Sequence, residues 1–521
     1  MARWLATAGV VTLLAACATE PGVATQSAQR LDTAVPSTEP TSAPPTTETP
    51  PAPPTSPASP STEQSATTGP PSTAAPSGTT QPPGQVGPLG DMIDVGDGKS
   101  PRDYDDFVRL ALTDIQQWWS EQFPAIYDQP FEPLAGGVYA GYPERTTPIP
   151  GCETTTPTPY EEIARYSAFY CMQGDFMVYD DGDQGVLYQL ASEFGASILG
   201  VVFAHEYGHV VQARADVLNE DLPTISTEQQ ADCFAGAWVA RARNGESPLL
   251  SFTDADVRNG LVAMITVRDP IGIDQFELGG HGSAFDRVGA FQTGFTEGPA
   301  RCAELIDDPL PLVPNVFQPG QGGDGNAEFG YGERQVMNFL PADLQAYWDQ
   351  QLAARGLAMP TLTLAPVQSA DEVACDDPTG AFAIGALYCP ATNQVYFDEP
   401  LARDLYDRFG DFVVGYILGG AWSEAGQTAM GSTLTGEARL LADDCFTGAW
   451  AATTIPGPDG ATERGTASIE PGDLDEAIQT ALVIGDETAD DNRLGSGFEK
   501  IASFREGVLD GIDACTAMVG D

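Results

Sequence analysis

The chain has 521 residues, of which 23 are basic and 74 are acidic, and its formal net charge at pH 7 is −51. A chain this acidic lacks the basic surface that nucleic acids and anionic lipid headgroups attract. The composition therefore excludes nucleic-acid binding and direct electrostatic binding to a membrane.

The first 17 residues have the pattern of an export signal. Arg3 is followed by an apolar run over residues 4–16, which is too short to span a membrane as a mature helix. Residues 14–17, Leu-Ala-Ala-Cys, resemble the lipobox of bacterial lipoproteins, which implies cleavage before Cys17 and lipid attached to its thiol. The alternative is an ordinary secretory signal in which Cys17 has no role. The lipobox predicts a protein on the extracytoplasmic face of the cell membrane, held there only by its lipid anchor.

Residues 18–88 consist almost entirely of Pro, Ser, Thr, Ala and Gly, with few charges. Such a segment buries too little apolar surface to fold, so we expect a disordered tether that lifts the globular part off the membrane. About 430 residues remain, which is enough for two or three domains.

Residues 194–213 predict one long helix that is apolar nearly all round, as is typical of a buried helix. It contains the pentapeptide His-Glu-Tyr-Gly-His at 205–209, with two of the chain's three histidines. Because positions i and i+4 share a helix face, His205 and His209 can bind one metal ion, with Glu206 beside the metal's water. The alternative is a pair of core histidines that hydrogen bonds satisfy.

A catalytic zinc usually has three protein ligands and one open position. Glu228 follows His209 by 19 residues, a spacing that suits a helix, a turn and a second helix. Thr224 or Ser226 would cap that second helix. Glu228 would then face the metal, and Asp232, one turn later, would accept a hydrogen bond from a ligand histidine.

Sequence motifs recur in the second part of the chain. The heptapeptide Asp-Cys-Phe-Ala-Gly-Ala-Trp at 232–238 returns at 444–450 with one change, and Tyr-Cys at 170–171 returns at 388–389. Val-Tyr at 178–179 returns at 395–396. Repetition on this scale predicts two tandem copies of one α+β domain, over residues 89–315 and 316–521.

Eight cysteines follow Cys17, and an even number in an exported chain indicates disulfides. If each copy closes its own bonds in the same way, four pairs result. The pairs are Cys152–Cys171, Cys233–Cys302, Cys375–Cys389 and Cys445–Cys515.

The pattern His205-Glu206-x-x-His209 followed by Glu228-x-x-Ala-Asp232 resembles the gluzincin metallopeptidases. Together with the motifs at 170–171, 178–179 and 230–238, it makes residues 103–302 similar to a bacterial family of neutral zinc metallopeptidases. The resemblance implies zincin-like domains, each with a small sheet and a buried active-site helix. It also implies one zinc per chain, in the first domain.

The third histidine gains a role from a second resemblance. His281 and Arg287 are similar to the downstream His…Arg element of the CAAX-protease type of gluzincins, in which these side chains stabilise the oxyanion. The residues between them depart from that element. The alternative for His281 is a surface histidine.

The second copy lacks the chemistry of the first. At the positions that correspond to His205, Glu206, His209 and Glu228 it has Gly420, Ala421, Glu424 and Leu440. Asp444 keeps the position of Asp232, and Lys500 replaces Arg287. This pattern predicts a pseudoenzyme domain without a zinc ligand set. Three roles stay open for it: a wall of the substrate cleft, a binding site for a partner protein, or stabilisation of the first copy.

The function predicted from these residues is zinc-dependent hydrolysis of a peptide or protein by a lipid-anchored protein, with Glu206 as general base. Two alternatives belong to other classes. One is a non-catalytic binding or scaffold lipoprotein built on a peptidase fold. The other is a zinc hydrolase that acts on a non-peptide amide of the cell envelope.

Overall fold

The computed structural model describes residues 93–152, 154–219, 222–269, 276, 280–314, 330–331, 336–377, 380–457, 462–463, 468–470, 472–485 and 496–520. The export signal with Cys17, the tether over 18–88 and the domain boundary at 315–316 lie outside these residues. Within the described residues, no helix has both the length and the apolar character needed to cross a membrane. We call residues 93–314 the N-terminal region and residues 330–520 the C-terminal region.

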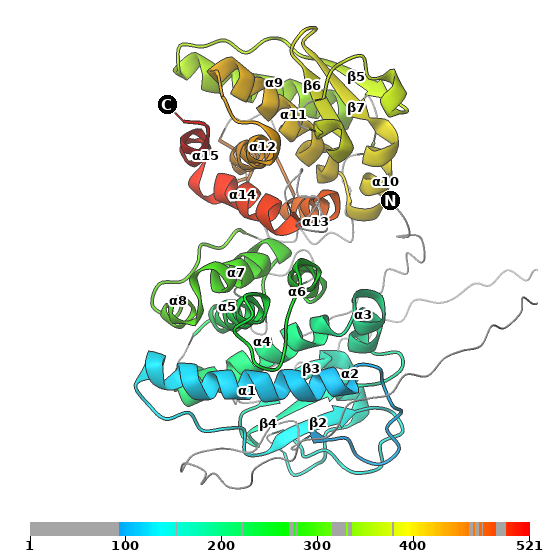
Figure 1. Ribbon diagram of the computed structural model, residues 1–521, viewed down its shortest axis with the longest axis vertical. Helices are drawn as coiled ribbons and strands as arrows, with labels where there is room; N and C mark the ends of the chain where they lie inside the picture. The colour runs from blue at the N-terminus through cyan, green and yellow to red at the C-terminus, as the bar shows by residue number, and fades with distance from the viewer. Residues whose placement is uncertain are drawn as a thin grey trace, which may run out of the picture. The chain divides into compact units, whose positions relative to one another are not determined.

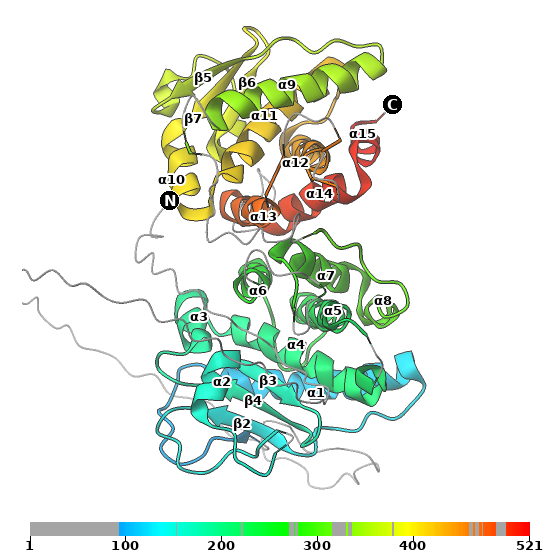
Figure 2. The same cartoon turned by 180° about the vertical axis from the view of Figure 1, so that it is seen from behind.

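Over the residues just given, the fold is of the α+β class and contains two small mixed sheets (Figures 1 and 2). The strands of the N-terminal region lie in the order β1-β2-β4-β3. β1 and β2 are parallel, as are β2 and β4, whereas β3 and β4 are antiparallel. Their bounds are β1 (Ile93–Asp94), β2 (Gly137–Gly141), β3 (Ala168–Cys171) and β4 (Phe176–Asp180).

Helix α4 lies between this sheet and the later helices of the N-terminal region (Figures 1 and 2). It contacts α1 and β3 on one side and α5 and α6 on the other, which is why almost every residue of α4 is buried. The helices of this region are α1 (Asp105–Tyr127), α2 (Tyr160–Tyr166), α3 (Val186–Phe194), α4 (Ser197–Arg214), α5 (Thr224–Arg243), α6 (Asp254–Thr266), α7 (Ala284–Glu297) and α8 (Pro299–Glu304).

Two local predictions need correction. The helix expected over 194–213 begins three residues later, at Ser197, because Gly195 has a φ of +94° and ends α3 at Phe194 before α4 begins. The second helix is not capped by Thr224 or Ser226. Its N-cap is Pro223, whose carbonyl oxygen accepts from the amide of Ser226, and no side chain caps it.

The C-terminal region contains a second sheet, in the order β5-β7-β6. Its central strand is parallel to β5 and antiparallel to β6, as β4 is to β2 and β3. The elements are α9 (Val336–Ala354), β5 (Thr363–Val367), β6 (Ala386–Cys389), β7 (Gln394–Asp398), α10 (Glu399–Phe409), α11 (Phe412–Met430), α12 (Gly436–Ala452), α13 (Asp473–Ile484), α14 (Gly497–Asp510) and α15 (Ile512–Val519).

Each region contains an equivalent hydrogen bond in its own core. In the N-terminal region the indole of Trp238 donates to Asp114 Oδ2 over 2.9 Å, which ties α5 to α1. In the C-terminal region the indole of Trp450 donates to Asp343 Oδ2 over 2.8 Å, which ties α12 to α9. A buried indole requires an acceptor, so each region fixes its long first helix in the same way.

Four disulfides join the cysteine pairs named from the sequence, and each closes within one region. Cys233–Cys302 spans 69 residues and ties α5 to α8, and Cys445–Cys515 spans 70 residues and ties α12 to α15.

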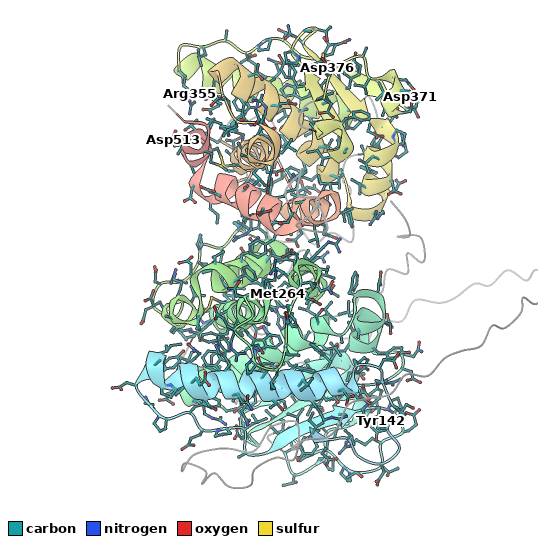
Figure 3. The ribbon with its side chains drawn as sticks, in the orientation of Figure 1. Tyr142, Met264, Arg355, Asp371, Asp376 and Asp513 are labelled. Atoms are coloured by element: carbon teal, nitrogen blue, oxygen red, sulfur yellow. A yellow bond between two sulfur atoms is a disulfide. The ribbon has the colours of Figure 1, made fainter. Side chains whose placement is uncertain are left out.

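Two contacts involve residues labelled in Figure 3, namely Tyr142 in the N-terminal region and Arg355 with Asp513 in the C-terminal region. The hydroxyl of Tyr142 donates to the carbonyl oxygens of Val95 and Asp97, both over 2.9 Å, and so holds the segment after β1. Arg355, which follows α9, lies 3.6 Å from the carboxylate of Asp513 on α15. Asp513 is almost fully exposed, so this ion pair contributes little to stability.

Candidate metal centre

Helices α4 and α5 bring His205, His209 and Glu228 together. Nε2 of His205 lies 3.3 Å from one carboxylate oxygen of Glu228, and Nε2 of His209 lies 3.4 Å from the other. One ligand atom from each of the three side chains can be chosen so that all three atoms lie within 4.8 Å of one another. The i, i+4 spacing on α4 therefore places both imidazoles on the face that α5 covers.

The three side chains are buried, and their polar atoms are poorly satisfied by the protein. Within the described residues, both oxygens of Glu228 and Nε2 of His209 are buried without a hydrogen-bond partner. Leaving such atoms unsatisfied costs about 1–3 kcal/mol each. Two imidazole nitrogens and a carboxylate are a common donor set for catalytic zinc, so these residues fit a zinc ion.

The carboxylate of Glu206 is also buried without hydrogen-bond partners in the described part of the chain. It is fully buried in α4 between the two histidines, and neither of its oxygens has a hydrogen-bond partner within the described residues. A buried carboxylate without partners is rare in a purely structural role, because burial of an unpaired charge is costly. Its place between the two histidines suits a group that acts on a molecule bound at the centre.

The other ring nitrogen of each histidine has a protein partner. Nδ1 of His205 lies 2.7 Å from Asp232 Oδ1. Nδ1 of His209 lies 2.8 Å from Oε1 of Gln212, whose amide nitrogen donates to the carbonyl oxygen of Thr227 over 2.7 Å. These contacts orient both rings so that Nε2 faces Glu228.

Sequence reasoning missed Gln212, although it stands three residues after His209 on the same helix face. That spacing was the available signal.

Neighbouring charges favour an ionised Glu228. Burial alone raises the pKa of Glu228, but the nearby charges of His209, His281 and His205 outweigh it and bring the pKa below its ordinary value.

Asp232 is held from both sides. The guanidinium of Arg287 donates to Oδ2 through Nε over 2.8 Å and to Oδ1 through Nη2 over 2.7 Å, and it donates through Nη1 to the carbonyl oxygen of Val267. Burial raises the pKa of Asp232, but Arg287 and His205 lower it more, so that the net shift is downward. Arg287 thus contacts Asp232, which in turn contacts Nδ1 of His205. The role of Arg287 at an oxyanion stays a prediction.

His281 is buried, so the alternative of a surface histidine does not describe it. Its Nδ1 lies 3.1 Å from Asp269 Oδ1, while Asp269 Oδ2 accepts from the backbone amides of His281 and Gly282. Burial lowers the pKa of His281, but Asp269 and the charge of Glu228 raise it above its ordinary value. Asp269 was also missed, because it precedes His281 by 12 residues in a loop, where no periodicity marks it.

The C-terminal region has a different arrangement at the corresponding place. A cavity of about 20 Å³, room for a single water, is lined by Gly420, Glu424, Leu440 and Asp444 among others. Burial raises the pKa of Glu424 to about 7. Asp444 accepts from the hydroxyl of Tyr416 over 2.6 Å and from Lys500 Nζ over 2.7 Å. No imidazole lies here, because the chain has no histidine after His281.

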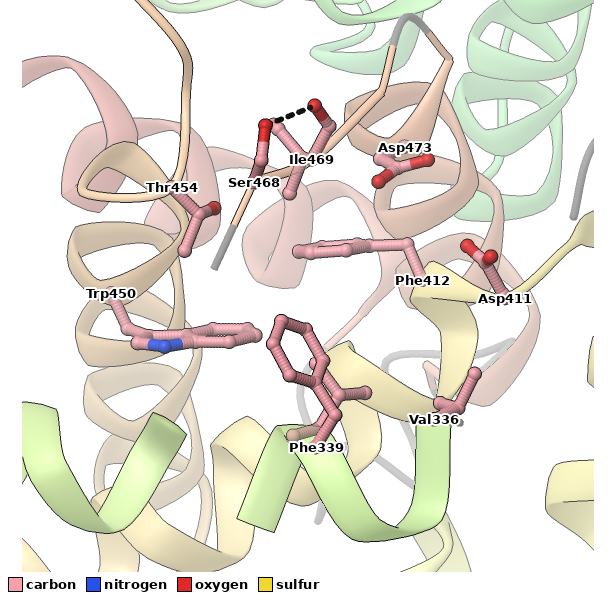
Figure 4. Close-up of a pocket in the computed structure, with 10 residues that line it drawn as sticks. Val336, Phe339, Asp411, Phe412, Trp450, Thr454, Ser468, Ile469 and Asp473 are labelled. Atoms are coloured by element: carbon pink, nitrogen blue, oxygen red, sulfur yellow. Dashed lines mark hydrogen bonds between the residues drawn. The ribbon is translucent and has the colours of Figure 1, made fainter. Parts of the chain in front are cut away.

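A second group of buried carboxylates lies beside an apolar cavity of the C-terminal region (Figure 4). Asp411 and Asp473 stand at the edge of this cavity, and with Glu476 they bring three carboxylate oxygens within 4.8 Å. Glu476 accepts from the amide of Phe412 over 2.8 Å, and burial, with the charges of Asp473 and Asp411, raises its pKa. This group lacks the nitrogen donors of the N-terminal centre, so the latter is the better zinc site.

The profile of the family described as "Putative neutral zinc metallopeptidase" matches residues 318–508. The matched segment covers most of the C-terminal region, whereas His205, His209 and Glu228 precede it. This result supports a zinc peptidase as the class of protein to which the chain is similar.

The chain is also similar to curated bacterial proteins without an assigned function. An uncharacterized protein of Mycobacterium tuberculosis is 33% identical over 152 residues, which cover 25% of this chain and 52% of the relative. The uncharacterized protein YpfJ of Escherichia coli is 28% identical over 159 residues, which cover 27% of this chain and 52% of the relative. The chain therefore spans about half the length of these relatives. No solved structure matches the chain.

Proposed function

We propose that the chain is a zinc-dependent peptidase with one metal centre, formed by His205, His209 and Glu228. The observation that carries the proposal is the set of buried nitrogen and oxygen atoms at this centre, of which those of Glu228 and His209 Nε2 lack hydrogen-bond partners among the described residues. Zinc bound there would supply a water of pKa about 7 and polarise the scissile carbonyl.

The protein's own groups would divide the remaining work. Glu206 takes a proton from the attacking water and passes it to the leaving amine. Asp232 and Gln212 hold the two histidines in the orientation that points Nε2 at the metal. His281, buried and close enough for its charge to act on Glu228, stabilises negative charge that develops on the substrate carbonyl.

The proposal includes the setting of this site. Residues 89–315 and 316–521 are tandem copies of one zincin-like domain, of which the second has lost its metal ligands. Cys17 carries a lipid that holds the exported protein at the extracytoplasmic face of the membrane. Mass spectrometry of the mature protein should find lipid on an N-terminal Cys17, whereas a mature N-terminus without lipid would contradict lipid anchoring.

The test of the mechanism is Glu206→Gln. We expect the variant to bind one zinc per chain but to hydrolyse a fluorogenic peptide library at least about 100-fold more slowly than the parent. Glu193→Gln, at an exposed position of α3, is the control and should match the parent. Equal turnover by Glu206→Gln and the parent would contradict the proposal.

A second candidate, a binding or scaffold lipoprotein on a peptidase fold, is favoured by the family match to the region without a ligand set. It predicts that the parent protein cleaves neither the peptide library nor unfolded protein, whether or not it binds a structural zinc ion. Cleavage that a chelator abolishes and zinc restores would exclude it.

A further inference from the structure

Helix α7, which carries Arg287, is capped from the C-terminal region. Asp475 in the first turn of α13 is buried, and its Oδ1 accepts from the backbone amide of Phe285 over 3.0 Å. The carboxylate also accepts a hydrogen bond from the amide of Ala284. These are the first two residues of α7, so a carboxylate there satisfies unpaired amides and interacts favourably with the helix dipole.

The same carboxylate reaches the segment that holds His281. Asp475 Oδ2 lies 3.2 Å from Nε of Arg268, whose side chain is largely buried. Arg268 directly precedes Asp269, and Asp269 binds both the ring and the backbone amide of His281. One side chain of the C-terminal region thus contacts both segments that lead to the metal centre.

A second contact fixes α7 in the same place. Arg505 on α14 donates through Nε to the carbonyl oxygen of Phe285 over 2.9 Å, and its guanidinium lies 4.6 Å from the centre of the Phe285 ring. Gly289 leaves the space that this guanidinium occupies, since a Cβ there would overlap it. Farther along, Gln292 donates to the carbonyl oxygen of Phe498 over 2.8 Å.

The path from Asp475 to the metal ligands is short. α7 carries Arg287, whose guanidinium forms two hydrogen bonds with Asp232, and Asp232 holds His205. A shift of α7 along its axis would therefore change the position of Asp232 and with it the orientation of the His205 ring. Outer partners of this kind typically change metal affinity or activity by about 10- to 100-fold when they are removed.

We propose that Asp475 is a positioning residue for the metal centre, and that the C-terminal region thereby holds α7 and the His281 segment in place. The contacts of Asp475 are with the start of α7 and with Arg268, not with the metal ligands, so it acts through these two segments. The inference rests on the proposed zinc centre, but it makes claims about the metal-free protein as well. It assigns a task to a region that lacks counterparts of His205, His209 and Glu228.

The test uses the full exported chain with Asp475→Ala and Asp475→Asn. In Asp475→Ala, the amides at the start of α7 should exchange hydrogen at least about 10-fold faster in the metal-free protein. Zinc affinity should fall by up to about 10-fold, less than for loss of a group that contacts a ligand directly, and the visible spectrum of the Co²⁺-substituted protein should change. Asp475→Asn keeps an acceptor for Phe285 but loses the charge opposite Arg268, so its effects should be smaller.

Leu418→Ala is the control for a purely structural effect, because Leu418 is fully buried in α11 of the C-terminal region. It should lower the melting temperature but leave the zinc affinity and the Co²⁺ spectrum unchanged. Asp475→Ala overturns the inference if it behaves like Leu418→Ala in every readout. Inactivity of the parent would instead refute only the proposed function, because exchange, affinity and spectrum do not depend on turnover.

Discussion

Asp232 in the N-terminal region and Asp444 in the C-terminal region have the same kind of partner on one side of the carboxylate and different partners on the other. Each is buried and bonded to a cation from the helix two elements later, Arg287 on α7 or Lys500 on α14. On the opposite side Asp232 meets His205, whereas Asp444 meets the hydroxyl of Tyr416. The buried ion pair persists without a histidine beside it, which shows that the fold itself uses the pair.

The comparison separates two kinds of residue in the N-terminal centre. Residues with a C-terminal counterpart, such as Asp232 and Gln212, support helix packing as well as the histidines. Other residues have no chemical counterpart in the C-terminal region, and the C-terminal region folds without them. These residues are His205, His209, Glu228 and Glu206. Such residues are the ones whose retention in the N-terminal region requires a chemical reason.

The largest expected effect concerns the ligands. His209→Ala should lower zinc affinity by about 100- to 1,000-fold, since zinc binding of roughly 10–16 kcal/mol is shared among a few ligands. Glu424→Ala, at the corresponding position of the C-terminal region, should leave zinc affinity unchanged. Competition with a chromogenic chelator measures both. A large loss in Glu424→Ala would show that the C-terminal region also holds the metal.

The long disulfides should contribute equally. Cys233–Cys302 and Cys445–Cys515 close loops of 69 and 70 residues, so the loss of loop-closure entropy from the unfolded chain is nearly the same. Replacing either pair with alanine should lower the free energy of unfolding by about 4 kcal/mol. Urea unfolding of the parent and of each double variant measures this free energy. A difference of more than about 2 kcal/mol between the two double variants would indicate that one region is coupled to other stabilising contacts.

The C-terminal region should lose stability as the pH rises. Burial raises the pKa of Glu424 from its ordinary value of 4.5 to about 7. The folded state therefore favours the protonated form, so stability present below pH 4.5 is lost as the pH rises through 7. The loss should reach ~3 kcal/mol.

Glu424→Gln should remove the contribution of Glu424 to the slope between pH 4.5 and 7.5, while Glu476, whose pKa is also raised, keeps part of the slope. The control Glu372→Gln, at an exposed position, should keep the full slope of the parent. Urea unfolding at the two pH values measures the difference. A parent whose stability is unchanged or higher at pH 7.5 would contradict the assignment.

Much of the centre could be predicted from local spacing, because a helix converts sequence distance into a shared face. This holds for His205, Glu206 and His209, and for Asp232 one turn after Glu228. The short split at Gly195 was missed because the apolar pattern continues across it. Asp269 and Asp475 could not be found in this way, because their contacts depend on how a loop and a distant helix approach α7.

A smaller effect is expected from the outer carboxylates. Asp232→Asn should weaken zinc binding by about 10- to 100-fold, because the neutral amide no longer places a negative charge next to Nδ1 of His205. Asp444→Asn should leave zinc affinity unchanged and instead destabilise the C-terminal region, since Lys500 stays buried opposite a neutral group. Equal zinc affinities in Asp232→Asn and the parent would mean that the Asp232–His205 contact has no role in metal binding.

The comparison also predicts that a metal centre can be restored in the C-terminal region. Gln427 keeps the contact of Gln212, since its amide donates to the carbonyl oxygen of Arg439 over 2.9 Å, at the position of Thr227. A Cβ at Gly420 would meet nothing within 4 Å, so the backbone leaves room for a side chain to begin there. The outer partners are therefore present, and only the ligands are missing.

The variant Gly420→His/Glu424→His/Leu440→Glu, with Tyr416→Phe to free Asp444 Oδ1, should bind two zinc ions per chain instead of one. The second ion should bind about 10- to 100-fold more weakly than the first, because Lys500 supports Asp444 through a single contact where Arg287 supports Asp232 through two. Metal analysis after gel filtration gives the stoichiometry. A correctly folded variant that still binds one zinc would show that the C-terminal region has changed in more than its ligands, and that the retained carboxylate and glutamine serve packing alone.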